Sequence, residues 1–246
     1  MNVFVTGGSR GIGRAIVLKM VEEGYGCAFT YSSKKEAADE TLNLCKKIDS
    51  KANVKAYRMD LKNVAEIESV AEGAIEAFEN IHVVVNNAAV VRNNAAALMS
   101  NEEWKDVIDT NLSGPFFVCR SFLLHFLSNK MGRIINISSL AQGGASGQAN
   151  YAASKAGLLG LTKTLAREYG AKGITCNVVV VGYVETDMTA NYLSDKLKKI
   201  WVEYCPMKRI GKAEEIAAMV YYLTTEDASF INGEVIHVSG GLTYIP

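Results

Sequence analysis

Several features are scarce in this sequence of 246 residues, and each scarcity excludes a class of protein. Only three prolines occur, hydrophobic residues make up 49% and charged residues 21%, which excludes a disordered chain. The formal net charge is zero, so no overall field recruits nucleic acid or an anionic membrane. The apolar runs are far shorter than the roughly 20 residues of a membrane span. We therefore expect neither nucleic acid nor a membrane as a partner.

Potential disulfide partners and metal ligands are also sparse. The five cysteines are odd in number, scattered and never spaced as Cys-x-x-Cys, which predicts buried thiols in a reducing compartment. The three histidines are isolated from one another and from carboxylates, so we predict no metal site. These residues are Cys27, Cys45, Cys119, Cys176, Cys205, His82, His125 and His237. A strand pattern begins almost at residue 1, so we expect no signal peptide and a cytoplasmic protein.

Short β-rich runs alternate with helical patterns along the whole chain. The runs that predict strands are 2–6, 26–31, 54–59, 83–87, 133–138, 174–181 and 235–239. The helical patterns are 13–24, 34–48, 63–78, 101–128, 151–170 and 212–224. Several strands are apolar on successive residues, which is typical of a parallel sheet covered on both faces. We predict a single α/β domain over residues 1–246, a doubly wound parallel sheet of seven strands flanked by helices.

A glycine-rich turn, "TGGSRGIG" (6–13), joins the first strand to the first helix. A turn without Cβ atoms lets the backbone approach a pyrophosphate, and the helix N-terminus offers free N–H donors. This context favours dinucleotide binding and a Rossmann-type sheet. The second strand ends "FTYSSKK" (29–35) with no carboxylate to bind a ribose hydroxyl, whereas Arg10 and Ser32 suit a 2′-phosphate. Lys34 and Lys35 are interpreted as the solvated start of a helix. We predict NADPH/NADP+ as the cofactor.

A Tyr-x-x-x-Lys pattern recurs along the chain, and its context separates one occurrence from the others. The four pairs are Tyr31/Lys35, Tyr151/Lys155, Tyr192/Lys196 and Tyr204/Lys208. Only Tyr151 opens a helix after a strand that ends in serines, which places it at the carboxyl edge of the sheet, where doubly wound folds bind ligands. Lys155 shares its helix face. We expect the cation to lower the pKa of the phenol, which then gives a proton to a carbonyl oxygen as a hydride arrives.

The ordered motifs resemble the short-chain dehydrogenase/reductase family. They are "TGGSRGIG", "NNAA" (86–89), "DTNLSGPF" with Asn111, the serine pair at 138–139, "YAASK" and "VGYVETDM" (181–188). More narrowly, "EEWKDVIDTNLSGPFF", "GQANYAASKAGLLGLTKTLARE" and "GYVETDMT" are similar to the 3-oxoacyl-[acyl-carrier-protein] reductase branch, which reduces 3-oxoacyl thioesters with NADPH. The resemblance implies a catalytic set of Asn111, one serine, Tyr151 and Lys155.

Which serine belongs to this set depends on two conflicting cues. The usual family spacing of thirteen residues before the tyrosine selects Ser138, whereas the strand motif "GRIINISS" supplies its second serine, Ser139. A strand cannot slip by one residue without turning every side chain to the opposite face, but a loop can lose a residue cheaply. We therefore predict Ser139, with the deletion inside "LAQGGASGQAN".

The resemblance also implies the cofactor contacts. They are Gly7, Ser9, Arg10, Gly11, Ile12, Gly13, Ser32, Asp60, Leu61, Asn87, Ala88, Ala89, Tyr151, Lys155, Val184 and Thr186. Asp60 is expected near the adenine amino group. The chain departs from the family at Ala89, where a glycine is usual, and at Val181, where a proline is usual.

Partners follow from the same resemblance. An acyl carrier protein is expected to dock on Lys130 and Lys172, beside the mouth of the active site. The resemblance also implies a homotetramer built from two paired long helices, roughly 101–128 and 151–170, and the C-terminal strand region. These helices carry apolar residues on more than one side, among them Phe116, Phe117, Phe122, Leu158 and Leu161. One alternative is a ketoreductase for another carbonyl, such as acetoacetyl-CoA, a polyketide, a sugar or a steroid. The other is a non-catalytic dinucleotide sensor, against which the complete catalytic set argues.

Overall fold

The computed structural model describes residues 1–186 and 195–245, and in this part of the chain seven parallel strands form one sheet. They are β1 (Asn2–Val5), β2 (Gly26–Tyr31), β3 (Val54–Arg58), β4 (Val83–Asn86), β5 (Gly132–Ser139), β6 (Ile174–Val181) and β7 (Val235–Val238). Their order is β3-β2-β1-β4-β5-β6-β7, so the chain reverses its direction of winding between β1 and β4. The predicted doubly wound parallel sheet is confirmed, and its switch point lies beside the glycine-rich turn.

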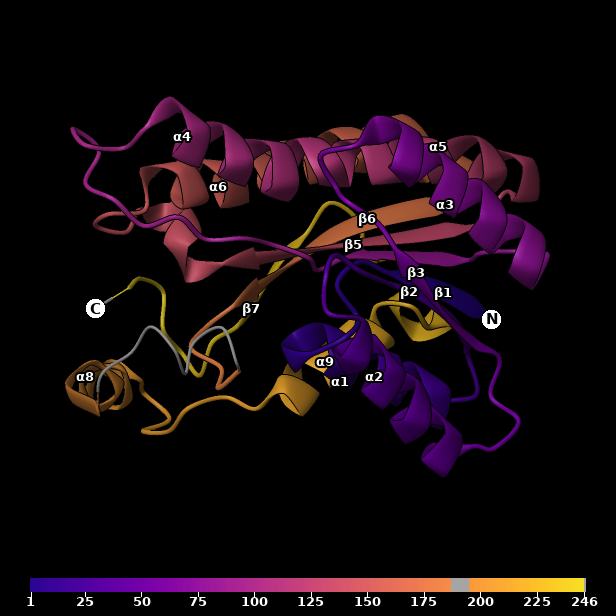
Figure 1. Cartoon of the computed structure of the whole chain (residues 1–246), viewed down its shortest axis with the longest axis horizontal. Helices are drawn as coiled ribbons and strands as arrows, with labels where there is room; N and C mark the ends of the chain where they lie inside the picture. The colour runs from indigo at the N-terminus through magenta and orange to yellow at the C-terminus, as the bar shows by residue number, and fades with distance from the viewer. Residues whose placement is uncertain (187–194, 246) are drawn as a thin grey trace.

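Helices cover both faces of the sheet (Figure 1). They are α1 (Gly11–Glu22), α2 (Lys35–Ile48), α3 (Val64–Phe78), α4 (Asn101–Ile108), α5 (Gly114–Asn129), α6 (Ala149–Tyr169), α8 (Asp195–Tyr204) and α9 (Ala213–Tyr222). One layer holds α1, α2 and α9, and the other holds α3, α4, α5 and α6. The helix α8 was not among the expected helices. In the described residues no helix has both the length and the apolar character that crossing a membrane requires.

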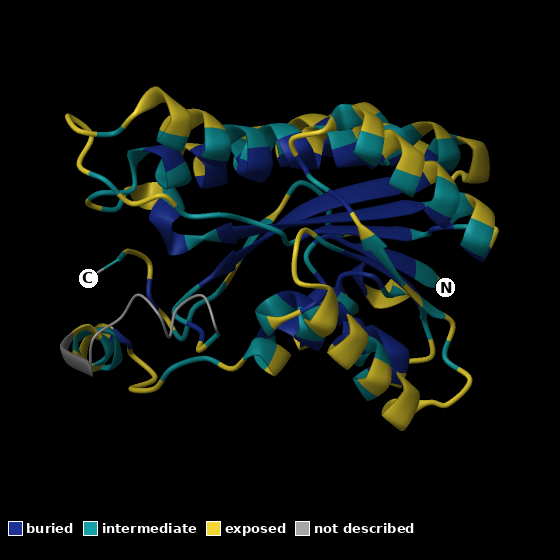
Figure 2. Cartoon of the chain, viewed as in Figure 1, coloured by how far each residue is buried: buried dark blue, intermediate teal, exposed yellow. Residues whose placement is uncertain are grey.

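The core lies on both sides of the central strands. Every residue of β4 and β6 is buried, because helices pack against each face (Figure 2). Alternate residues of β1 pack against opposite helix layers. Val3 and Val5 pack against α1, while Phe4 meets Phe122 of α5 with ring centroids 4.9 Å apart. Burying each such side chain contributes about 1.5–3 kcal/mol, so the sheet that carries the site is held rigidly.

The predicted helix at 101–128 is interrupted. A single π-helical turn, Asp109–Ser113, separates α4 from α5 and contains Asn111. Pro115 has no N–H to donate to the carbonyl of Asn111 four residues earlier, so a regular α-helix cannot continue there. Such π turns are frequent at functional sites, where they redirect a side chain.

The apolar residues expected to build an oligomer divide into two groups. Phe122 and Leu158 are buried inside their own subunit, so they are unavailable to a partner and that part of the prediction is wrong. Phe116 is 43% exposed, and Leu124 on the same helix is 77% exposed. The five cysteines are all free and buried, as predicted.

Candidate active site

The glycine-rich turn forms a tight cradle after β1. Gly7 has a φ of +68°, a conformation that favours glycine. A Cβ on Gly13 would collide with the carbonyl oxygen of Gly7, so only glycine fits there. The Asn87 side-chain amide donates to the carbonyls of Thr6 at 3.0 Å and Gly7 at 3.2 Å. These bonds hold the cradle open toward a ligand.

The start of α1 points its backbone donors into this cradle. In the described chain, the N-cap residue Arg10 makes no side-chain capping bond, and the first turn holds no acidic residue. The first N–H groups of the helix are therefore available to an anion, and the helix dipole favours negative charge there. A pyrophosphate fits both the space and the donors.

A cleft of about 500 Å³ runs along the carboxyl edge of the sheet from this cradle. Every residue predicted to contact the cofactor lines it, including Arg10, Ser32 and Asp60 toward one end and Val184 and Thr186 past the end of β6. They come from the segments after β1, β2, β3, β4 and β6 and from α6, so only the fold brings them together. The Tyr192/Lys196 pair cannot be placed in this way, because Tyr192 lies outside the described residues.

The structure brings Tyr151, Lys155 and Ser139 together in the same cleft. The Ser139 hydroxyl lies close enough to the Tyr151 phenol to lower the pKa of that phenol. The Ser139 oxygen already accepts from the Ala141 N–H at 3.2 Å, which leaves its own proton free to donate. Ser138 is buried, and its hydroxyl donates to the Lys155 carbonyl and to Gln142, both at 3.0 Å. Ser139 therefore faces the phenol, and Ser138 supports the helix behind it.

Asn111 is the one predicted catalytic residue whose side chain is absent from the lining of the described cleft. It is fully buried, and its amide binds both backbone groups of Val90: the Val90 N–H donates to its oxygen at 2.8 Å, and its nitrogen donates to the Val90 carbonyl at 2.9 Å. It also donates to Ser154 at 3.3 Å, one turn beyond Tyr151. Its side chain therefore acts on the wall of the cleft.

The pKa values of Tyr151 and Lys155 differ from the expectation. Burial raises the pKa of Tyr151 to about 12, and the nearby Ser139 hydroxyl only partly offsets this. Lys155 does not lower it in this state. Burial lowers the pKa of Lys155 from 10.5 to about 8, and its ammonium donates to the Ile137 carbonyl at 2.8 Å, 5.7 Å from the centre of the Tyr151 ring. Because desolvation outweighs charge attraction here, the phenol stays protonated at neutral pH.

Lys155 should therefore make the stability of the cofactor-free protein depend on pH. Its pKa is about 8 in the folded chain and 10.5 as an ordinary lysine, so between these values the unfolded chain binds more protons. The free energy of unfolding should rise by about 2 kcal/mol between pH 7 and 9.5 relative to a Lys155→Met variant. Urea titrations of both proteins at the two pH values measure this. A constant difference between them would show that Lys155 is not desolvated.

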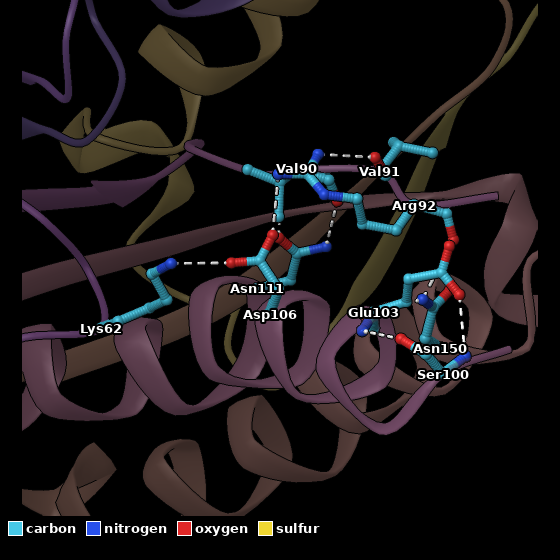
Figure 3. A network of polar contacts seen from close by, with 9 residues as sticks. All are labelled: Lys62, Val90, Val91, Arg92, Ser100, Glu103, Asp106, Asn111 and Asn150. Atoms are coloured by element: carbon cyan, nitrogen blue, oxygen red, sulfur yellow. Dashed lines mark hydrogen bonds and ion pairs between the residues drawn. The ribbon is translucent and has the colours of Figure 1, made fainter.

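Two ion pairs that share one carboxylate form a bridge at the cleft, and it was not predicted from the sequence. Asp106 of α4 binds Lys62 at 2.8 Å and Arg92 at 2.8 Å, and all three residues line the cleft (Figure 3). They are far apart in the sequence, and although Asp106 lies inside the stretch "EEWKDVIDTNLSGPFF", nothing in that stretch indicates its two partners. The bridge joins the loop after β3 to the loop after β4.

The expected placement of Lys130 and Lys172 is wrong for a single subunit. Lys130 ends α5 just before β5, and Lys172 lies just before β6. Both exposed residues are therefore at the amino edge of the sheet, whereas Ser139 and Val181 at the carboxyl ends of the same strands line the cleft. Each strand has eight residues, so the two edges are roughly 23 Å apart. The lysines do not rim the mouth.

Comparison with known proteins gives consistent results. A family model described as enoyl-(acyl carrier protein) reductase matches residues 7–243. The 3-oxoacyl-[acyl-carrier-protein] reductase FabG of Staphylococcus epidermidis is 41% identical over 245 residues, which cover 98% of this chain and 98% of that protein. The protein of the same name from Salmonella typhimurium is 42% identical over 239 residues, covering 97% and 95%.

A solved structure, that of levodione reductase, matches with a TM-score of 0.91 and 29% identity, and it covers 98% of this chain and 96% of the other. The similarity thus extends over the sheet, the cradle and the catalytic cleft together. The chain belongs to the short-chain dehydrogenase/reductase family and is an oxidoreductase whose cofactor is a nicotinamide dinucleotide.

Proposed function

We propose that this protein reduces 3-oxoacyl thioesters carried on an acyl carrier protein to 3-hydroxyacyl thioesters, with NADPH, in fatty acid or polyketide-type biosynthesis. The observation that carries the proposal is the placement of the Ser139 hydroxyl beside the Tyr151 phenol, inside a cleft that continues into the dinucleotide cradle. The names of the relatives point to the same substrate.

The chain's own residues account for the proton chemistry. NADPH supplies a hydride to the carbonyl carbon when it is bound. The Ser139 hydroxyl and the Tyr151 phenol are arranged to donate to one carbonyl oxygen, and a raised phenol pKa keeps the proton on Tyr151 until negative charge develops on that oxygen. Lys155, whose pKa is about 8, is a buried cation below that pH and stabilises the phenolate that forms.

Arg10 is proposed to bind the 2′-phosphate of NADPH. Arg10 is exposed and lines the same cleft as Ser32. The strand that precedes Ser32 ends without a carboxylate. Arg10→Ala should lower kcat/KM for NADPH about 10-fold, because a charge-assisted bond to phosphate is lost, and leave kcat/KM for NADH unchanged. Initial rates with each cofactor at constant salt measure the ratio.

The matched control is Lys35→Ala, which removes an equal charge nearby. Lys35 pairs with Asp39 at 3.1 Å and is absent from the described lining of the cleft, so both cofactors should react as before. Equal kcat/KM values for NADPH and NADH in the unchanged protein would contradict the assignment.

A panel of substrates tests the proposed reaction. NADPH oxidation would be followed with a 3-oxoacyl thioester on carrier protein, a small thioester mimic, acetoacetyl-CoA, a sugar or steroid ketone, and a 2-enoyl thioester. The enoyl arm is included because the matching family model is described by that activity. The highest kcat/KM is expected for the carrier-linked 3-oxoacyl thioester. A higher value for the enoyl thioester or for an unrelated ketone would overturn the proposal.

We also propose a cytoplasmic homotetramer. The exposed side chains of Phe116 and Leu124 on α5 and Trp104 on α4 support association, because an isolated subunit would leave them in water. Five free thiols suit a reducing compartment. Light scattering at micromolar concentration should give four times the 26.7 kDa of one chain, and a value of 26.7 kDa would refute the assembly.

A further inference from the structure

The helix that carries Tyr151 begins in an unusual way. Its N-cap residue is Gln148, which in the described structure makes no side-chain capping bond. The first N–H groups of a helix have no partner within the helix and need an acceptor from elsewhere. At Tyr151 that acceptor is the side chain of Asn150, whose Oδ1 accepts from the Tyr151 N–H at 2.7 Å.

The amide nitrogen of Asn150 has two further partners on two other segments. It donates to the Arg92 carbonyl at 3.1 Å and to the Glu103 carbonyl at 3.1 Å (Figure 3). Asn150 is fully buried, so no water competes for these bonds. One side chain thus ties the start of α6 to the loop after β4 and to α4.

The first part of the loop after β4 is held at two points by buried asparagine side chains. Asn111 binds both backbone groups of Val90, and Asn150 binds the backbone of Arg92 two residues later. Val90 and Arg92 line the cleft, and Asp106 fixes the Arg92 guanidinium. Asn111 also reaches α6 through Ser154. The position of the phenol in the cleft therefore depends on a closed set of bonds that Asn150 completes.

We propose that Asn150 is a positioning residue for proton transfer, which sets the distance between the Tyr151 phenol and the carbonyl oxygen of the substrate. The proposal rests on the proposed carbonyl reduction, but it requires no particular ketone. Most of the expected cofactor contacts lie in the glycine cradle and after β2 and β3, which Asn150 does not touch among its hydrogen bonds in the described structure. A loss of Asn150 should consequently act on kcat and leave KM for NADPH unchanged.

The first experiment compares Asn150→Ala with Ser100→Ala. Ser100 caps α4, accepting from the Glu103 N–H at 3.1 Å, so its loss weakens the same helix without touching the Tyr151 segment. Asn150→Ala should lower kcat on the order of 10-fold with KM for NADPH unchanged, since small misplacements of reacting groups are costly. Ser100→Ala should leave kcat unchanged. Equal losses of kcat in both variants would reduce Asn150 to a structural role and overturn the proposal.

A second variant, Asn150→Asp, keeps a side-chain oxygen that can accept from the Tyr151 N–H, but it should change how kcat depends on pH. Its carboxylate would face the carbonyls of Arg92 and Glu103, whereas its protonated form can donate to one of them. The nearby charges are already engaged: the Glu103 carboxylate by the Ser100 N–H and Asn94, and the Arg92 guanidinium by Asp106. Relative to the unchanged enzyme, kcat of Asn150→Asp should rise as pH falls from 8 to 6. An unaltered profile would contradict the positioning role.

Hydrogen exchange separates this proposal from the proposed function. Amide exchange of the segment 149–154, followed by mass spectrometry of the cofactor-free protein, should be faster in Asn150→Ala and unchanged in Ser100→Ala. If no 3-oxoacyl thioester is reduced, the proposed function fails, and the kinetic comparison is made with whichever ketone the protein reduces. If exchange is unchanged in Asn150→Ala, the positioning proposal fails whatever the substrate.

Discussion

Tyr151→Phe is expected to lower kcat for carbonyl reduction by about 10³-fold, because it removes the phenol that lies beside Ser139 in the described cleft. The ring and its packing stay, and Lys155 keeps its bond to the Ile137 carbonyl. The affinity for NADPH should therefore change little. Stopped-flow single turnovers measure the chemical step, and fluorescence titration with NADPH measures binding.

The chain contains a matched control for this variant. Tyr204 belongs to the same Tyr-x-x-x-Lys pattern, with Lys208, but it is exposed on α8 and lies outside the described lining of the cleft. Tyr204→Phe should leave kcat unchanged. If Tyr151→Phe retained most of the turnover, Tyr151 could not be the proton donor, and the catalytic assignment would have to be abandoned.

The second large effect separates the two adjacent serines. Ser139→Ala should lower kcat on the order of 10²-fold, because a hydroxyl free to donate to the reacting oxygen is lost. Ser138→Ala should lower kcat much less and instead reduce stability by about 1 kcal/mol, since its buried hydroxyl bonds the Lys155 carbonyl and Gln142. Paired measurements of kcat and of urea unfolding for both variants test this.

The two serines should thus give opposite patterns of rate and stability. If Ser138→Ala cost more turnover than Ser139→Ala, the thirteen-residue spacing would outweigh strand register. The register itself is observed: Ser138 pairs with Val180 and Ser139 with Val181 at the end of β5. The loop that follows, with its short turn Leu140–Gly143, is where a residue can be lost without disturbing the sheet.

Two structural features that differ from the expectation have a signal in the sequence. Lys130 and Lys172 each precede a strand, and in a parallel sheet residues before the strands gather at the amino edge, away from a ligand at the carboxyl edge. Pro115 inside the expected helix 101–128 indicated the interruption that occurs at Asn111. In both cases the local pattern is present in the sequence, and its consequence becomes visible in three dimensions.

The alternation of strands and helices, the dinucleotide cradle and the edge of the sheet that carries the site could be predicted from the sequence alone, because each depends on short-range patterns. Apolar runs, a glycine-rich turn and helical spacing place Gly7, Tyr151 and Lys155 without knowledge of their neighbours. The match of Ser139 with Tyr151 also followed from local rules, since strand register decides which way a side chain points.

Only the tertiary structure decided the properties that depend on contacts between distant segments. Burial by surrounding elements raises the pKa of Tyr151 and lowers that of Lys155, although the helical spacing of the two residues suggested the opposite for the phenol. Asp106 joins Lys62 to Arg92, and Asn150 joins α6 to two other segments, through contacts that the local sequence around these residues does not indicate. Desolvation and hydrogen bonding between remote residues have no signature in a local pattern, because they arise only when the chain has packed.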